Sequence, residues 1–109
     1  MLASLAGSLP DNELRSIVTS FLNDAKARQV RISALAQQGD LPALAREAHD
    51  LAGTAGNVGA SRLAELAREL QQRCKSNDLD GVVALTAAIA EAADTAAALL
   101  RSRYLAAVA

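Results

Sequence analysis

Hydrophobic residues recur every three or four positions along four stretches of the chain, which is the spacing of an α-helix that buries one face. These stretches predict helices over about residues 10–38, 41–57, 60–76 and 79–106. The positions predicted to face inward are Leu14, Val18, Phe21, Ala25, Ile32 and Leu35, then Leu41, Leu44, Ala48, Leu51, Ala55 and Val58, then Leu63, Leu66, Ala67, Leu70 and Cys74, and finally Val82, Ile89, Ala93, Ala96 and Leu100. The pattern places the chain in the all-α class.

The residues at the ends of these helices agree with the pattern. Pro10 and Pro42 stand in the first turns of the first two helices, where the missing N–H of a proline breaks no hydrogen bond. Asp40 and Asp78 precede helices and have side-chain oxygens suited to capping free N–H groups. Because long helices joined by a few residues pack as antiparallel neighbours, we expect an up-down-up-down four-helix bundle, one domain over residues 1–109.

Composition narrows the possible partners. Hydrophobic residues make up 51% of the chain and aromatic residues 2%, so the core must consist of aliphatic side chains and alanines. Eleven Lys and Arg against twelve Asp and Glu give a net charge of -1, which is too balanced for an electrostatic binder of nucleic acid or of an anionic membrane surface. No run of 18 residues is apolar and uncharged, as a membrane-spanning helix would require. Together with the charge balance, this means that we expect neither nucleic acid nor a membrane as partner.

The cysteine count bears on the compartment and on metals. Cys74 is the only cysteine, which excludes an internal disulfide, and no Cys/His cluster is present to hold a zinc ion. We therefore expect a cytoplasmic protein without a metal site.

His49 is the only histidine, and its direction decides what it can do. At 100° per residue it lies roughly 130° from the inward stripe of the second helix, on the solvent side. The residues one and two turns away on that face are mostly small: Ala45, Arg46, Ala52, Gly53 and Gly56. A glycine inside a helix costs about 1 kcal/mol relative to alanine, so two glycines there suggest that another surface must come close to the imidazole.

The segment from His49 to Ala60, HDLAGTAGNVGA, followed by Leu63, resembles the signature of the histidine-containing phosphotransfer (HPt) domains of bacterial phosphorelays. That signature runs His-x-Leu-Lys-Gly-x-Ala, then a glycine and a small residue at the start of the next helix. The four-helix layout and the chain length agree with the family over essentially the whole sequence.

The resemblance implies that His49 accepts a phosphoryl group from the aspartate of a receiver domain, or from a kinase, and passes it to another receiver. It implies receiver domains of response regulators or a hybrid histidine kinase as partners. It also implies no cofactor on this chain, with Mg²⁺ supplied by the receiver, no kinase activity of its own, and a monomer.

One position departs from the family pattern. The usual lysine three residues after the histidine is Ala52 here, so the charge that neutralises the phosphoryl group must come from elsewhere or be absent. Arg46, one turn before His49, is one candidate. If the second and third helices fold back about Val58, Arg68 or Gln71 can also flank the imidazole.

Two other functions remain open from the residues. The chain could be an adaptor that binds a receiver or kinase without being phosphorylated, which the missing lysine favours and the retained histidine opposes. It could also be a small enzyme with His49 as general base, although neither a nucleophile nor an orienting carboxylate accompanies the histidine.

Overall fold

The computed structural model describes residues 11–58 and 60–105. These residues form four α-helices and no strand, which confirms the all-α prediction. The helices are α2 (Asp11–Gln38), α3 (Leu41–Asn57), α4 (Ser61–Lys75) and α5 (Leu79–Leu100), and a π-helical turn, η1 (Arg101–Leu105), follows α5. The predicted helix start at residue 10 and end at residue 106 lie outside the described residues.

Capping aspartates and left-handed turns fix where α3 and α5 begin. Asp40 accepts a hydrogen bond from the backbone N–H of Ala43 at 3.2 Å, and Asp78 accepts one from that of Gly81 at 3.0 Å. The preceding turns contain the positive φ angles of Gly39 (71°) and Asn77 (55°), a conformation that glycine and asparagine adopt at little cost.

Gly81 has a specific reason to be glycine. A Cβ atom at this position would lie 2.6 Å from Oδ2 and 2.9 Å from Cγ of Asp78. The aspartate that caps α5 therefore occupies the space that any other residue at position 81 would need.

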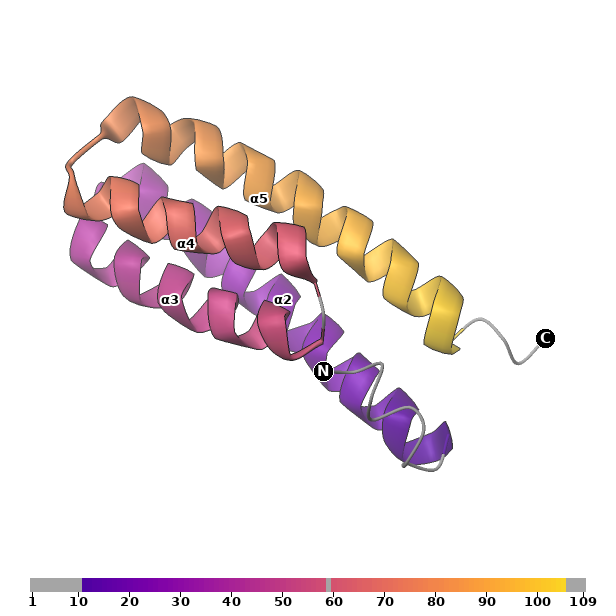
Figure 1. The fold of residues 1–109 in the computed structure, drawn as a ribbon. Helices are drawn as coiled ribbons and strands as arrows, with labels where there is room; N and C mark the ends of the chain where they lie inside the picture. Colours follow the sequence, from indigo (N-terminus) through magenta and orange to yellow (C-terminus); the bar gives the residue numbers. More distant parts are fainter. Residues whose placement is uncertain (1–10, 59, 106–109) are drawn as a thin grey trace.

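Each helix packs against the next along the chain, and α5 also packs against α2, so that the four helices surround one core (Figure 1). The core of the described residues is built from aliphatic side chains, alanines, Phe21 and Cys74. Of the predicted inward positions, Leu35, Leu41, Val58, Ala93 and Ala96 are only half-buried, and the others are buried.

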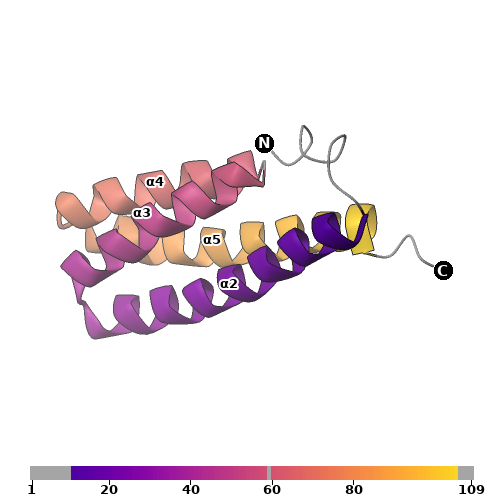
Figure 2. The ribbon, with the colours of Figure 1, turned by 90° about the horizontal axis from the view of Figure 1, so that it is seen from below.

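The partial exposure of α5 follows from the unequal helix lengths. The helices α2 and α5 have 28 and 22 residues against 17 and 15 in α3 and α4, and they run on beyond the ends of the shorter pair (Figures 1 and 2). Shallow grooves flank α5 there: Ala96 lines one beside α4, and Ala93 lines one beside α2.

The stretch Leu79–Tyr104 is long and apolar enough to cross a membrane by length and composition, with a mean hydropathy of 1.6. The sequence criterion missed it because the stretch contains Glu91 and Asp94. Core helices pass the same test, and this helix packs against α4 and α2 in the bundle, although only 17% of the apolar window is buried.

Candidate functional site

His49 lies in the middle of α3 with an exposed side chain. Its orientation follows from the buried stripe of the same helix, in which Leu44, Ala48, Leu51 and Ala55 are at most 1% exposed. Because these residues fix which side of α3 faces the core, the imidazole must point toward solvent.

His49 lines an open hollow between α3 and α4. Its lining consists of Ala45, Arg46, His49 and Asp50 from α3 and Gln71 and Lys75 from α4. We call these six residues the His49 hollow. It combines two cations and an amide with a single carboxylate, so its own charge favours an anion placed on the imidazole.

The hollow contains one of the two residues predicted to flank His49 from α4. Gln71 lines it, together with Lys75, whereas Arg68 is not among its lining residues. The hollow extends from His49 toward the end of α4, where Gln71 and Lys75 lie. The sequence does contain a signal for Lys75, since it stands four residues after Gln71 on the same helix face.

The small residues beside His49 divide into two kinds. Gly53 is exposed and Gly56 is half-buried, and a Cβ atom added to either would meet nothing within 4 Å. Packing within the described residues therefore gives no reason for glycine at these positions. That another protein surface comes close to the imidazole here stays a prediction. Ala45 is half-buried at the edge of the hollow.

Ala52 is not part of an exposed surface. It is 6% exposed and belongs to the core cluster, so its assignment to the docking surface was wrong. The helical wheel placed it beside His49 but took no account of α4, which packs against this side of α3.

A second charged group adjoins the hollow on the side of α2. Arg28 lies 2.8 Å from Asp24 on its own helix, 3.2 Å from Glu47 and 3.6 Å from Asp50 on α3. The hydrogen bond to Asp24 raises the pKa of Arg28, with smaller contributions from the charges of its acidic partners, while partial burial acts in the opposite direction. Asp50 is thus exposed but paired, and its partner on another helix cannot be inferred from the pattern of α3 alone.

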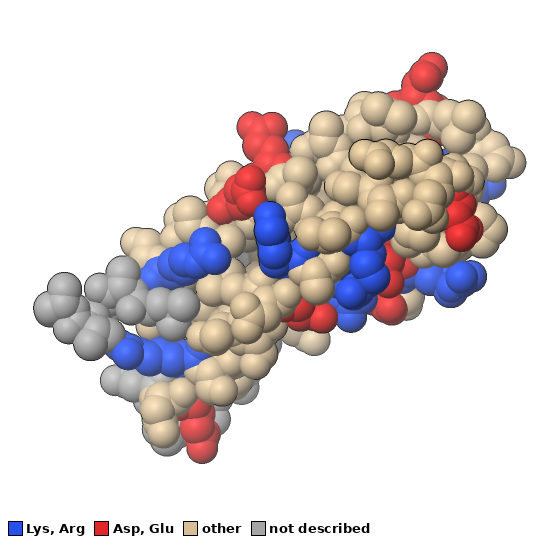
Figure 3. All heavy atoms as spheres, turned by 180° about the vertical axis from the view of Figure 1, so that it is seen from behind, with Lys and Arg blue, Asp and Glu red and all other residues tan. Residues whose placement is uncertain are grey.

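Other features of the described residues do not form a comparable site. Charges of both signs are interspersed on the face seen in Figure 3, without a basic patch. No group of three or more His, Cys, Asp or Glu side chains among the described residues could hold a metal ion. Burial raises the pKa of the Cys74 thiol, which keeps it a neutral part of the core.

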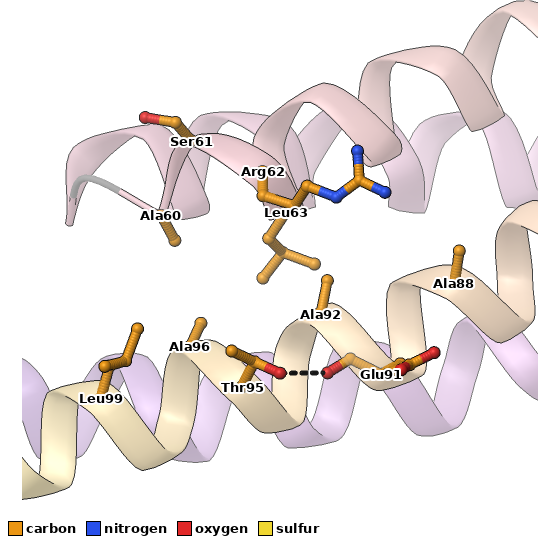
Figure 4. A pocket seen from close by; sticks show the side chains of 10 residues that line it. All are labelled: Ala60, Ser61, Arg62, Leu63, Ala88, Glu91, Ala92, Thr95, Ala96 and Leu99. Atoms are coloured by element: carbon orange, nitrogen blue, oxygen red, sulfur yellow. Dashed lines mark hydrogen bonds between the residues drawn. The ribbon is translucent and has the colours of Figure 1, made fainter.

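A groove between the first turn of α4 and the second half of α5 lies at the other end of α4 from Lys75 (Figure 4). Its lining is mostly apolar: Ala60, Ser61, Arg62, Leu63, Ala88, Glu91, Ala92, Thr95, Ala96 and Leu99. The hydroxyl of Thr95 donates to the backbone carbonyl of Glu91 at 3.1 Å. The groove contains neither a histidine nor a cysteine.

Comparison with protein families identifies the kind of domain that carries the His49 hollow. The family model for the Hpt domain matches residues 16–102. The chain belongs to the Hpt domain family. This membership confirms the resemblance seen in the segment that begins at His49, and comparisons with curated proteins and with solved structures gave no match.

Membership assigns the chain a coarse role. An Hpt domain implies histidine phosphotransfer in two-component phosphorelays, in which such domains work with receiver domains and kinases. In this Hpt domain the exposed imidazole is His49, since no other histidine is present.

Proposed function

We propose that this Hpt domain accepts a phosphoryl group on His49 from the aspartate of a receiver domain, or from a kinase, and passes it to the aspartate of another receiver. The observation that carries the proposal is the position of the one histidine, exposed on α3 in a hollow that also contains Arg46, Gln71 and Lys75.

The chemistry asks for a neutral imidazole in line with the bond that breaks. The unprotonated ring nitrogen of His49 uses its lone pair to form an N–P bond, while the P–O bond to the receiver's aspartate breaks and the carboxylate leaves with that electron pair. The other ring nitrogen keeps its hydrogen. At the second receiver the N–P bond breaks, its electron pair returns to the ring, and a new P–O bond forms on the acceptor carboxylate.

We assign charge stabilisation to the cations of the hollow. Lys75 and Arg46 supply positive charge on either side of the imidazole, and the Gln71 amide can donate a hydrogen bond to a phosphoryl oxygen. Lys75 thereby replaces, from the neighbouring helix, the lysine that is missing at Ala52. This arrangement explains how the domain can function with an alanine at that position.

The receiver supplies the remaining chemistry. We propose that Mg²⁺ is held by the receiver's own acidic residues, that this chain has no kinase activity, and that it acts as a monomer in a bacterial cytoplasm. An antiparallel up-down-up-down order of the helices is part of the proposal, supported by the short connections and by the packing of each helix on the next. Gly53 and Gly56 leave room for the receiver to approach the imidazole.

Ala52 supports a second candidate function. Without a lysine at this position the domain could bind a receiver or kinase as an adaptor and never be phosphorylated. Phosphorylation and adaptor function differ in one measurable property, which is whether a covalent phosphate appears on His49.

The test is to incubate the purified chain with a phosphorylated receiver and to follow acid-labile, base-stable phosphate on the wild type and on His49→Gln. We expect label on the wild type and none on H49Q. A set of receivers that bind the chain but never label it would overturn the relay function and support the adaptor. Label that persists on H49Q would place the phosphate on another residue.

A further inference from the structure

The ion-pair cluster between α2 and α3 contains more acids than bases. Arg28 contacts Asp24, Glu47 and Asp50 at 2.8, 3.2 and 3.6 Å, and Nε of Arg31 lies 3.2 Å from Glu47. The side chains of Arg28 and Glu47 are both 19% exposed, so this part of the cluster is largely shielded from solvent. Among the described residues, Arg28 is the only cation in contact with Asp50.

Asp50 links this cluster to the histidine. It follows His49 in the chain and lines the His49 hollow, where its carboxylate is the only anionic group. A phosphoryl group on His49 brings up to two negative charges into the same hollow. Two like charges about 4 Å apart repel by about 1 kcal/mol in water and by more where the surroundings are less polar.

We propose that Arg28 is a positioning residue for phosphotransfer, which holds the Asp50 carboxylate on the α2 side of the His49 hollow and offsets its charge. The inference rests on the proposed phosphorylation of His49. Arg28 does not line the hollow itself, so its effect on the phosphoryl group passes through Asp50. The side chain of Asp50 is 54% exposed, so packing does not hold its carboxylate in place once Arg28 is removed.

The test is a double-mutant cycle on the full chain, with the initial rate of label transfer from a phosphorylated receiver as the readout. We expect Arg28→Gln to lower this rate about fivefold to tenfold, because the unpaired carboxylate then repels the incoming phosphoryl group. In the Asp50→Asn background, which has no such carboxylate, the same R28Q change should alter the rate less than twofold.

Two further measurements separate this role from a merely structural one. The deficit of R28Q should shrink when ionic strength rises from about 0.05 to 0.5 M, because salt screens the repulsion. Arg31→Gln is the matched control. Arg31 belongs to the same cluster, but it contacts Glu47 and not Asp50, so its removal should leave the labelling rate at the wild-type value. Thermal unfolding of each variant reports whether the fold is intact.

The outcomes are distinguishable. If the wild type takes label and R28Q is equally fast, or if R28Q is slow and D50N does not restore it, Arg28 does not act through Asp50 and the inference is wrong. A wild-type chain that takes no label overturns the proposed function, and this inference with it.

Discussion

An exposed histidine on a helix is an ordinary surface feature, and the charged side chains around His49 distinguish it from other such histidines. Lys75 and Arg46 bring positive charge to the hollow, while Arg28 draws the single carboxylate, Asp50, toward α2. The imidazole can therefore receive an anionic group without being buried. The proposed nucleophile, the cations near it and the carboxylate of Asp50 come from α3 and α4, and Arg28 of α2 contacts that carboxylate.

The positive charge of Lys75 can be tested by substitution. We expect Lys75→Gln to slow phosphoryl transfer to His49 about threefold to tenfold, because the product loses a nearby positive charge worth about 1 kcal/mol. The measurement is the initial labelling rate from a phosphorylated receiver, with circular dichroism to check the fold.

Arg62→Gln is the control for Lys75. It removes the same charge from the other end of the same helix, where Arg62 lines the groove beside α5. Equal losses in the two variants would mean that the overall charge of α4, and not the position of Lys75, sets the rate.

At the scale of elements, the glycines inside helices serve different purposes. Gly81 is required by the capping Asp78, whose carboxylate fills the space of a Cβ atom, whereas Gly53 and Gly56 border open space. A glycine inside a helix lowers the stability of that helix. Among the described residues, only Gly81 has a neighbour, Asp78, that leaves no room for a side chain.

This contrast predicts opposite effects of one substitution. Gly81→Ala should lower the free energy of unfolding by about 1 kcal/mol, because the added Cβ atom clashes with Asp78 and so disturbs an N-cap of about that energy. Gly53→Ala should raise it by about 0.5–1 kcal/mol through helix propensity and yet slow transfer from the receiver, because the added methyl group stands on the approach to His49. Urea unfolding and labelling rates measure the two effects. A Gly53→Ala variant that is more stable and fully active would contradict the close-approach surface.

At the scale of the whole molecule, burial is uneven. The short helices α3 and α4 provide most of the buried positions and position the His49 hollow, while α5 buries only Val82, Ile89 and Leu100 along its 22 residues. The first turns of α2 and the end of α5 extend beyond the other two helices (Figure 2). The site thus lies on the more tightly packed half of the bundle.

We expect native-state hydrogen exchange to reflect this division. Amides in the middle of α3 and α4 should exchange only by global unfolding, while those near the start of α2 and after Ala93 in α5 should exchange about ten times faster or more through local opening. Exchange followed by NMR at each amide provides the measurement. Uniform protection along α5 would show that the extension is as stable as the core.

Features that depend on local spacing could be predicted from the sequence. The helical period identified four helices, capping aspartates and Pro42 indicated where α3 and α5 begin, and the wheel of α3 placed His49 in solvent, because all of these follow from backbone geometry within one helix. The motif beginning at His49 was enough to indicate the family.

Contacts between helices required the folded structure. The register of α4 against α3 places Lys75 at the hollow, Ala52 is buried in the core, and the proximity of α2 pairs Arg28 with Asp50. A helix presents its stripe equally well when a neighbour slides along it by one turn, so the period of the pattern does not fix that register. Packing of the side chains between the helices does.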